Sequence, residues 1–285
     1  MKLFINPTNI HKMNKIALDE LIIHMGIQRV HNIGEADVIY SAGQPMNTEQ
    51  FPNKKYIFGP HFSVFPNPQA RSISGRYNNA VYIQPSQPSV DTWVGEFSFN
   101  NIPVKAFPFP VNMDRYKPSD SKKDTALIYF KRRREDELNL VIDILGKHGY
   151  KYELIRYGSY QEAQYQSLLN RSKFVFCLGR HESQGFAIQS ALAKDIPMIV
   201  WDVRLRKQEV GFEKKYLNVK SPVTTVPYWD SRCGEKFFDA DNLEKTFDKF
   251  ILNLDTYKPR EFMQETVSVE ACANNFLTLV KSIGK

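Results

Sequence analysis

Residues 174–202 read FVFCLGRHESQGFAIQSALAKDIPMIVWD, and this stretch decides the fold. An apolar run leads through a short polar loop around Glu182 into a helix that opens at Gly185, and a second apolar run follows. Apolar runs that flank a helix are typical of parallel strands buried in an α/β protein. Where such a helix begins, free backbone N–H groups and the positive end of the helix dipole favour a bound phosphate. We predict that the amides of Phe186 and Ala187 bind it.

The rest of the chain repeats this alternation of strand and helix on both sides of residues 105–118, KAFPFPVNMDRYKP. Strands are predicted at 2–6, 37–41, 56–58, 81–83, 126–130 and 152–156, and helices at 13–25, 136–147, 160–170 and 241–252. This order indicates doubly wound α/β units, and the proline-rich segment between them indicates a boundary. We predict a first Rossmann-like domain over 1–116 and a second over 120–258.

Length, charge and cysteine content narrow the class of protein. With 285 residues the chain can bury one large core or two modest ones. A net charge of +7 and a pI near 9.1 suit an anionic small molecule, an acidic membrane surface or nucleic acid, and alone they choose none of these. The widely spaced Cys177, Cys233 and Cys272 indicate packing residues in a reducing compartment.

Targeting, metal and nucleic-acid signals are weak in this sequence. No segment approaches the ~20 apolar residues that cross a bilayer, and the apolar start at 2–5 is too short for a secretory signal. We therefore expect a cytoplasmic protein whose basic surface leaves room for peripheral contact with a membrane. No second His or carboxylate stands at ligand spacing from His181, so no metal site is predicted. The cations do not alternate with aromatic residues, so nucleic acid is not an expected partner.

The spacing of four residues resembles the donor site of GT-B glycosyltransferases, most closely that of the retaining family 4. These residues are Glu182, Gly185, Ala191 and Pro197. The family pattern places a second Glu eight positions after the first, where it grips the ribose hydroxyls of the nucleotide. Ser190 stands at that position here, with Gln189 beside it. Either these two side chains hold the ribose through neutral hydrogen bonds, or the site has drifted.

The resemblance has consequences for the fold. It implies two Rossmann-like domains with a cleft between them, and a last helix, over 262–285, that crosses back to the first domain. Ser268 is the expected N-cap of the final helical pattern. Four further residues fall close to the register of a family signature at the domain boundary. They are Pro110, Asn112, Asp114 and Pro118.

A run of four cations at 131–134 follows the predicted strand 126–130. Ligands of an open parallel sheet bind outside the carboxyl ends of its strands, so these cations start in a suitable place. The resemblance implies that an Arg and a Lys neutralise the donor diphosphate as it leaves. We assign this role to Lys131 or Arg132, with Arg133 as a further donor contact. The alternative is a solvated surface turn, balanced by the carboxylates of residues 135–137.

The remaining candidates have alternatives of their own. The resemblance implies that Glu182 holds sugar hydroxyls and steadies the positive charge that develops at the anomeric carbon. The alternative is a simple partner of the helix dipole, which contributes ~0.3–1 kcal/mol. Gly185 serves either a phosphate site or close packing of the helix. His61, which follows a strand of the first domain, is a candidate contact for donor or acceptor, and its alternative is an incidental loop residue.

The implied activity is transfer of a sugar from a UDP- or GDP-sugar to a saccharide or other hydroxyl acceptor. Retention at the anomeric carbon is implied, without an obligatory metal or a further cofactor. Two alternatives stay open. One is an inverting, fucosyltransferase-like GT-B enzyme, faintly suggested by KFVFCLGRHES at 173–183. The other is a sugar-nucleotide-binding protein without activity, which Ser190 would permit.

Overall fold

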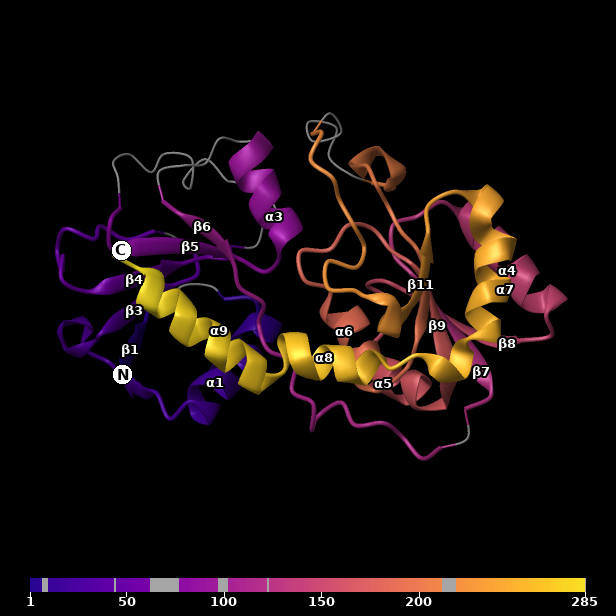
Figure 1. Cartoon of the computed structure of the whole chain (residues 1–285), viewed down its shortest axis with the longest axis horizontal. Coiled ribbons are helices and arrows are strands. Elements are labelled where there is room, and N and C mark those ends of the chain that lie inside the picture. Colours follow the sequence, from indigo (N-terminus) through magenta and orange to yellow (C-terminus); the bar gives the residue numbers. More distant parts are fainter. Residues whose placement is uncertain are drawn as a thin grey trace. The chain divides into compact units, whose positions relative to one another are not determined.

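The computed structural model describes residues 1–6, 10–43, 45–61, 77–96, 102–121, 123–211 and 219–284. The chain forms two compact units, Met1–Asn112 with Thr266–Lys285 and, separately, Met113–Glu265. Each unit carries its own parallel sheet with helices around it (Figure 1). No helix in these described ranges is long and apolar enough to span a membrane.

The first unit is built on a six-stranded parallel sheet in the order β2-β1-β3-β4-β5-β6. The strands are β1 (Lys2–Ile5), β2 (Gln28–Val30), β3 (Val38–Ser41), β4 (Lys55–Phe58), β5 (Ala80–Gln84) and β6 (Val104–Ala106). The helices are α1 (Lys12–His24), α3 (Gln87–Asp91) and α9 (Val269–Ser282). The predicted strands of this half are confirmed, whereas β2 and β6 have no counterpart in the prediction.

The last helix, α9, belongs to the first unit. The Ser268 Oγ accepts a hydrogen bond from Ala271 N (3.1 Å), which confirms the predicted N-cap. The helix packs against α1 (Figure 1), and Lys55 Nζ of β4 donates to the Val280 carbonyl (2.7 Å). Its buried residues lie on one face: Cys272, Ala273, Phe276 and Leu279. Segments from both ends of the chain therefore share one core.

The second unit is built on a five-stranded parallel sheet in the order β11-β10-β9-β7-β8. The strands are β7 (Thr125–Phe130), β8 (Lys151–Arg156), β9 (Ser172–Leu178), β10 (Met198–Trp201) and β11 (Gly234–Phe237). The helices are α4 (Glu135–Lys147), α5 (Glu162–Arg171), α6 (Phe186–Ala193), α7 (Leu243–Leu252) and α8 (Pro259–Val267).

Aromatic packing fixes this second sheet. Phe174 and Phe176 of β9 pack against Phe247 of α7, with ring centroids 6.1 and 6.2 Å apart. All four residues of β10 are buried, as its continuous apolar run predicts for a central parallel strand. Because the strands are parallel, the carboxyl ends of β7, β9 and β10 lie at one edge of the sheet, and the loops that leave this edge carry the candidate site.

Candidate functional site

The site is centred on an ion pair between Lys131 and Glu182. Lys131 follows β7 and Glu182 lies in the loop after β9, so adjacent strands bring together residues that are 51 positions apart. Lys131 Nζ lies 2.5 Å from Glu182 Oε1, and the two side chains are 7% and 14% exposed. The same ammonium lies 4.1 Å from the ring centroid of Tyr157, just after β8. Charges this well shielded from water interact more strongly than charges on the surface.

Contacts from the segment after β10 fix the loop that carries Glu182. Glu182 N donates to Thr224 O (3.0 Å). The backbone N and the ring Nδ1 of His181 lie 2.9 and 2.6 Å from Glu209 Oε1, and both of these side chains are buried. Sequence reasoning missed Glu209 and Thr224, because isolated polar residues between strands carry no periodic signal.

Helix α6 begins next to this loop. Its N-cap, Gly185, has φ 82° and ψ 53°, a left-handed conformation that favours glycine and offers no side-chain acceptor to the helix. The backbone ladder starts with Gln189 N, which donates to Gly185 O (2.9 Å). The half-buried Phe186 and Ala187 precede that ladder. Amides in the first turn of an α-helix have no partner in the helical ladder, so those of Phe186 and Ala187 are suited to an anion or to water. The phosphate contact predicted for them stays a prediction.

Two buried side chains of α6, Gln189 and Ser190, lie where the resembled pattern has a ribose carboxylate and just before it. Ser190 Oγ donates to the Ala187 carbonyl (2.9 Å), which also accepts from the Tyr165 hydroxyl (2.8 Å). Gln189 Oε1 accepts from Gln184 Nε2 (3.0 Å). Gln189 Nε2 is buried and has no acceptor among the described residues. The Gln189 side chain therefore has an N–H donor available for a ligand, whereas the Ser190 hydroxyl already donates its proton to the Ala187 carbonyl.

Two neutral groups, the Tyr129 hydroxyl and the Cys177 thiol, lie within the electrostatic influence of the ion pair. Burial first, and the Glu182 carboxylate second, raise the pKa of the Tyr129 hydroxyl above its ordinary value. The same two causes raise the pKa of the Cys177 thiol. Both groups stay protonated near neutral pH and add no charge to the site. In the described ranges, no group of three or more His, Cys, Asp or Glu side chains is arranged to hold a metal.

The run of cations at 131–134 divides by burial. Arg132 has φ 52°, and this left-handed residue is exposed between two buried neighbours, Lys131 and Arg133. Its carbonyl accepts from Val210 N (2.9 Å). Arg134 is exposed and pairs with Asp136 at 3.0 Å on the surface. Lys131 thus contacts Glu182 at the carboxyl edge, whereas the exposed Arg132 and Arg134 both fit the solvated-turn alternative. The diphosphate contact predicted for Arg132 stays a prediction.

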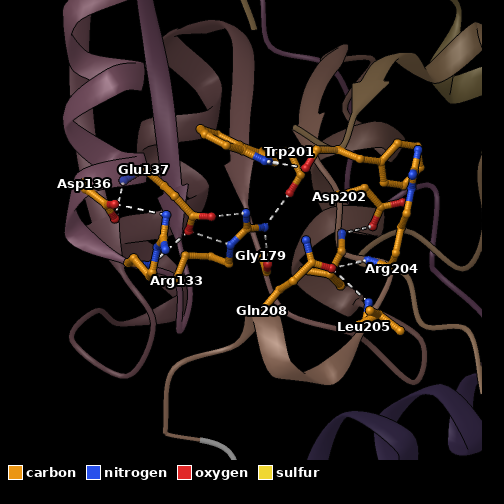
Figure 2. Close-up of polar contacts among 12 residues, drawn as sticks. Arg133, Asp136, Glu137, Gly179, Trp201, Asp202, Arg204, Leu205 and Gln208 are labelled. Atoms are coloured by element: carbon orange, nitrogen blue, oxygen red, sulfur yellow. Dashed lines mark hydrogen bonds and ion pairs between the residues drawn. The ribbon is translucent and has the colours of Figure 1, made fainter. Parts of the chain in front are cut away.

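Arg133 turns inward instead. Its Nε and Nη2 donate to the two carboxylate oxygens of Glu137 at 2.9 and 2.7 Å. Its Nη1 donates to the carbonyls of Gly179 (3.2 Å) and Trp201 (2.8 Å), as Figure 2 shows. The side chain is fully shielded from solvent, and these protein partners occupy all three nitrogens. This geometry argues against the donor contact predicted for Arg133, because a phosphate would have to displace those partners.

His61 belongs to the first unit, directly after the Gly59–Pro60 bond that follows β4. Its Nδ1 lies 2.7 Å from the Tyr82 hydroxyl, and its ring lies edge-on to Trp93 with centroids 5.0 Å apart. Burial raises the pKa of Tyr82, so its hydroxyl stays protonated. The role predicted for His61 toward donor or acceptor stays a prediction.

Comparison with known proteins bears on the fold. No family model matches the chain, and no curated protein matches it significantly. The lipopolysaccharide outer core galactosyltransferase WaaB, in its apo form, is similar in structure with a TM-score of 0.58 at 12% identity over 99% of each chain. Sucrose-phosphate synthase from Thermosynechococcus elongatus gives a TM-score of 0.53 at 12% identity, over 97% of this chain and 81% of that one.

A third similar structure is a mutant of S. aureus TarM in complex with Fondaparinux, alpha-GlcNAc-glycerol and UDP. Its TM-score is 0.51 at 13% identity, and the match covers 86% of this chain and 55% of TarM, so this chain spans about half the length of that protein. At such low identity the likeness concerns the backbone arrangement. Two Rossmann-like units, each with a parallel sheet, match these proteins along most of the chain. The chain therefore has the GT-B fold, which the resemblance at residues 182–197 implies, and the α/β class predicted from its pattern of strands and helices is confirmed.

Proposed function

We propose that this protein is a glycosyltransferase that moves a sugar from a nucleoside diphosphate sugar to a hydroxyl acceptor. The observation that carries the proposal is the Lys131–Glu182 pair beside the uncapped amino end of α6, at the carboxyl edge of the second sheet. An ammonium and free amides suit a diphosphate, and a carboxylate suits sugar hydroxyls. The fold shared with a galactosyltransferase and with UDP-bound TarM supports this choice of ligand.

Each group has a task in the transfer. The bond between the anomeric carbon and the diphosphate oxygen breaks, and the acceptor oxygen forms the new bond to that carbon. The acceptor hydroxyl gives its proton to the leaving diphosphate, directly or through water. Lys131 and the amides of Phe186 and Ala187 stabilise the negative charge of the leaving diphosphate, and the exposed Arg132 adds to it. Glu182 binds sugar hydroxyls and stabilises positive charge at the anomeric carbon.

The finer features of the reaction belong to this proposal as well. The positive groups supply the charge that Mg²⁺ supplies in other transferases, so we propose a reaction that needs no metal. The donor is a UDP- or GDP-sugar, the acceptor is a saccharide or another hydroxyl compound, and the anomeric configuration is retained. The unused donor on Gln189 Nε2 supports ribose recognition through a neutral amide. NMR of the product distinguishes retention from inversion.

One observation favours a second candidate, a sugar-nucleotide-binding protein without activity. The hydroxyl proton of Ser190 is bound to the Ala187 carbonyl at the position where the family pattern has a ribose carboxylate. A hydrogen bond to a charged group contributes about 1.5–3 kcal/mol, so its loss weakens nucleotide binding about tenfold or more. Calorimetric binding of UDP or GDP without transfer to any acceptor of a panel would favour this candidate.

Two measurements test the proposed function. A thermal-shift screen of UDP, GDP, ADP and their sugars should identify a ligand, because saturation at a hundredfold over Kd adds about 2.7 kcal/mol of stability. The Glu182→Gln variant should then release nucleoside diphosphate from the sugar nucleotide about 10²–10³-fold more slowly.

The matched control is Glu244→Gln. Glu244 also pairs with a lysine, Lys147, but on the surface, where its side chain is 60% exposed. This variant should turn over at the wild-type rate. Failure of every nucleotide to shift the melting curve, or full turnover by Glu182→Gln, would remove the basis of the proposal.

A further inference from the structure

Arg133 ties together four elements of the second unit. It lies in the loop between β7 and α4, and its guanidinium donates to Glu137 in the first turn of α4. The same guanidinium donates to the carbonyl of Gly179, just after β9, and to that of Trp201, the last residue of β10. Figure 2 shows Arg133 between the Glu137 carboxylate and these two carbonyls. One side chain thus links the carboxyl ends of three neighbouring strands, because its own loop continues β7.

The Arg133 guanidinium and the Glu137 carboxylate neutralise each other where little solvent reaches them. The Arg133 side chain is fully buried and that of Glu137 is 10% exposed. Glu137 Oε2 also accepts from Arg134 N (3.0 Å), which anchors the start of α4. A bidentate Arg–carboxylate pair has a fixed planar geometry that a lysine cannot reproduce. The link therefore defines the positions of the backbone groups that it contacts.

Both members of the candidate ion pair lie close to this link along the chain. Lys131 is two residues before Arg133, and Glu182 is three residues after Gly179. Lys131 N donates to Leu178 O (2.8 Å), which continues the ladder between β7 and β9 up to the link. A shift of the Gly179 carbonyl would therefore move the start of the Glu182 loop relative to Lys131.

The β10 end holds the same loop from the other side. Asp202 follows Trp201 and is buried, and its Oδ1 accepts from Thr225 N (2.6 Å) while its Oδ2 accepts from the Thr224 hydroxyl (2.8 Å). The Thr224 carbonyl in turn accepts from the Glu182 amide. The carboxyl end of β10 thus braces the Glu182 loop twice, through Arg133 and through Asp202.

We infer that Arg133 is a positioning residue that sets the geometry of the Lys131–Glu182 pair through the carbonyls of Gly179 and Trp201, without contact to the substrate. This inference rests on the proposed function for its effect on turnover. The effect of Arg133 on the position of the Glu182 loop does not depend on the proposed function. Misplacement of a reacting group by about 1 Å can cost 10²-fold in rate, so the position of Glu182 matters for catalysis.

The test uses Arg133→Lys, which keeps the charge and loses the planar fork. With UDP-glucose, UDP-galactose and GDP-mannose as probes, kcat for nucleoside diphosphate release should fall about 10- to 100-fold, while KM for the probe stays within about twofold. The same substitution in the Glu182→Gln background should have almost no further effect, because Arg133 acts through Glu182.

Hydrogen exchange provides a readout that does not depend on activity. In Arg133→Lys the amides of residues 180–185 should exchange about tenfold faster, while those of α7 stay unchanged. The matched control is Arg232→Lys, which alters an arginine paired with Asp230 and Glu265 just before β11, at the opposite edge of the sheet. This control should change neither turnover nor exchange at 180–185.

The outcomes separate the two proposals. Equal loss of kcat in both Glu182 backgrounds, or unchanged exchange at 180–185, would overturn the positioning role. If wild-type protein turns over none of the probes, the proposed function fails for them and the exchange measurement decides on Arg133. If Arg133→Lys does not fold, Glu137→Gln replaces it, because this change loosens the guanidinium and leaves both carbonyls in place. It must then show the same fall in kcat at unchanged KM.

Discussion

The Lys131–Glu182 pair is costly for a protein to keep, because both charges have left most of their water. Removing one partner of such a pair leaves an unpaired buried charge, which typically costs about 3–5 kcal/mol, whereas removing both costs less. We predict that Lys131→Met and Glu182→Met each destabilise the protein strongly. The double variant should be less destabilised than the sum of the two by about 1–3 kcal/mol. Urea denaturation of the four proteins measures this coupling.

The surface pair of Lys147 and Glu244 is the matched control, with side chains 63% and 60% exposed. Its coupling should stay below about 1 kcal/mol. Additive costs at Lys131 and Glu182 would show that water or another group already compensates each charge.

The three cysteines give a prediction on pH and reactivity. All three are free and buried. Burial raises the pKa of Cys233 and of Cys272 to about 12, and it raises the pKa of Cys177 as well. A thiol with a raised pKa in the folded protein contributes stability below its unfolded pKa, and this contribution is lost as the pH rises through the folded value.

At pH 8 the folded protein should therefore react slowly with a colorimetric thiol reagent, and all three thiols should react at once in urea. Stability at constant ionic strength should fall as the pH rises above about 9. Immediate reaction of one equivalent with the folded protein would mean that a thiol is accessible.

At the scale of elements, the loop after β9 depends on a close approach at Gly179. A Cβ on this residue would lie 2.3 Å from Thr225 Cγ2 and 3.5 Å from Cys177 Sγ. We predict that Gly179→Ala destabilises the protein by about 1–3 kcal/mol, and that Thr225→Ser, which removes the offending methyl group, restores part of this loss. Thermal unfolding of the two single variants and the double variant measures the rescue.

Gly185→Ala is the comparison variant. Its Cβ would meet only ordinary contacts at 3.5 Å, and the cost comes from φ 82° alone, about 1–2 kcal/mol. Thr225→Ser should give no rescue there. If Thr225→Ser rescued both glycine variants, its effect would not come from relief of the clash between the new Cβ at position 179 and the Thr225 methyl group.

The elements also show how far the sequence could be read. Segments such as α4 and β9 follow from their patterns, because α4 buries one face over several turns and β9 is an almost continuous apolar run. β2 and β6 have three residues each, too few for a period to appear. The alternation of buried and exposed side chains along residues 131–134 could not be predicted either, because the left-handed backbone at Arg132 cannot be seen in a run of four cations. Glu209 and Thr224 could not be predicted from the sequence, because they contact His181 and Glu182 across 28 and 42 positions of the chain.

On the scale of the whole molecule, one of the two compact units is built from two segments that are far apart in the sequence. The second unit is one continuous segment, Met113–Glu265, whereas the first is completed by Thr266–Lys285. The completing helix supplies core residues, since Phe276 is buried and its ring lies 5.8 Å from that of Phe107. Lys105 Nζ also donates to the Ser282 hydroxyl (2.7 Å). The stability of the first unit therefore depends on residues at the far end of the chain.

Two neighbouring residues of α9 test this dependence. Phe276→Ala removes a buried ring and should destabilise the first unit by about 3–5 kcal/mol, whereas Leu277→Ala, at a position that is 42% exposed, should cost less than about 0.5 kcal/mol. Hydrogen exchange locates the loss. Amides of β3 and β4 should exchange faster in Phe276→Ala, and those of β7 and β9 should not. Faster exchange in all four strands would instead mean that both units unfold as one, and an equal effect of Leu277→Ala would contradict the packing of α9.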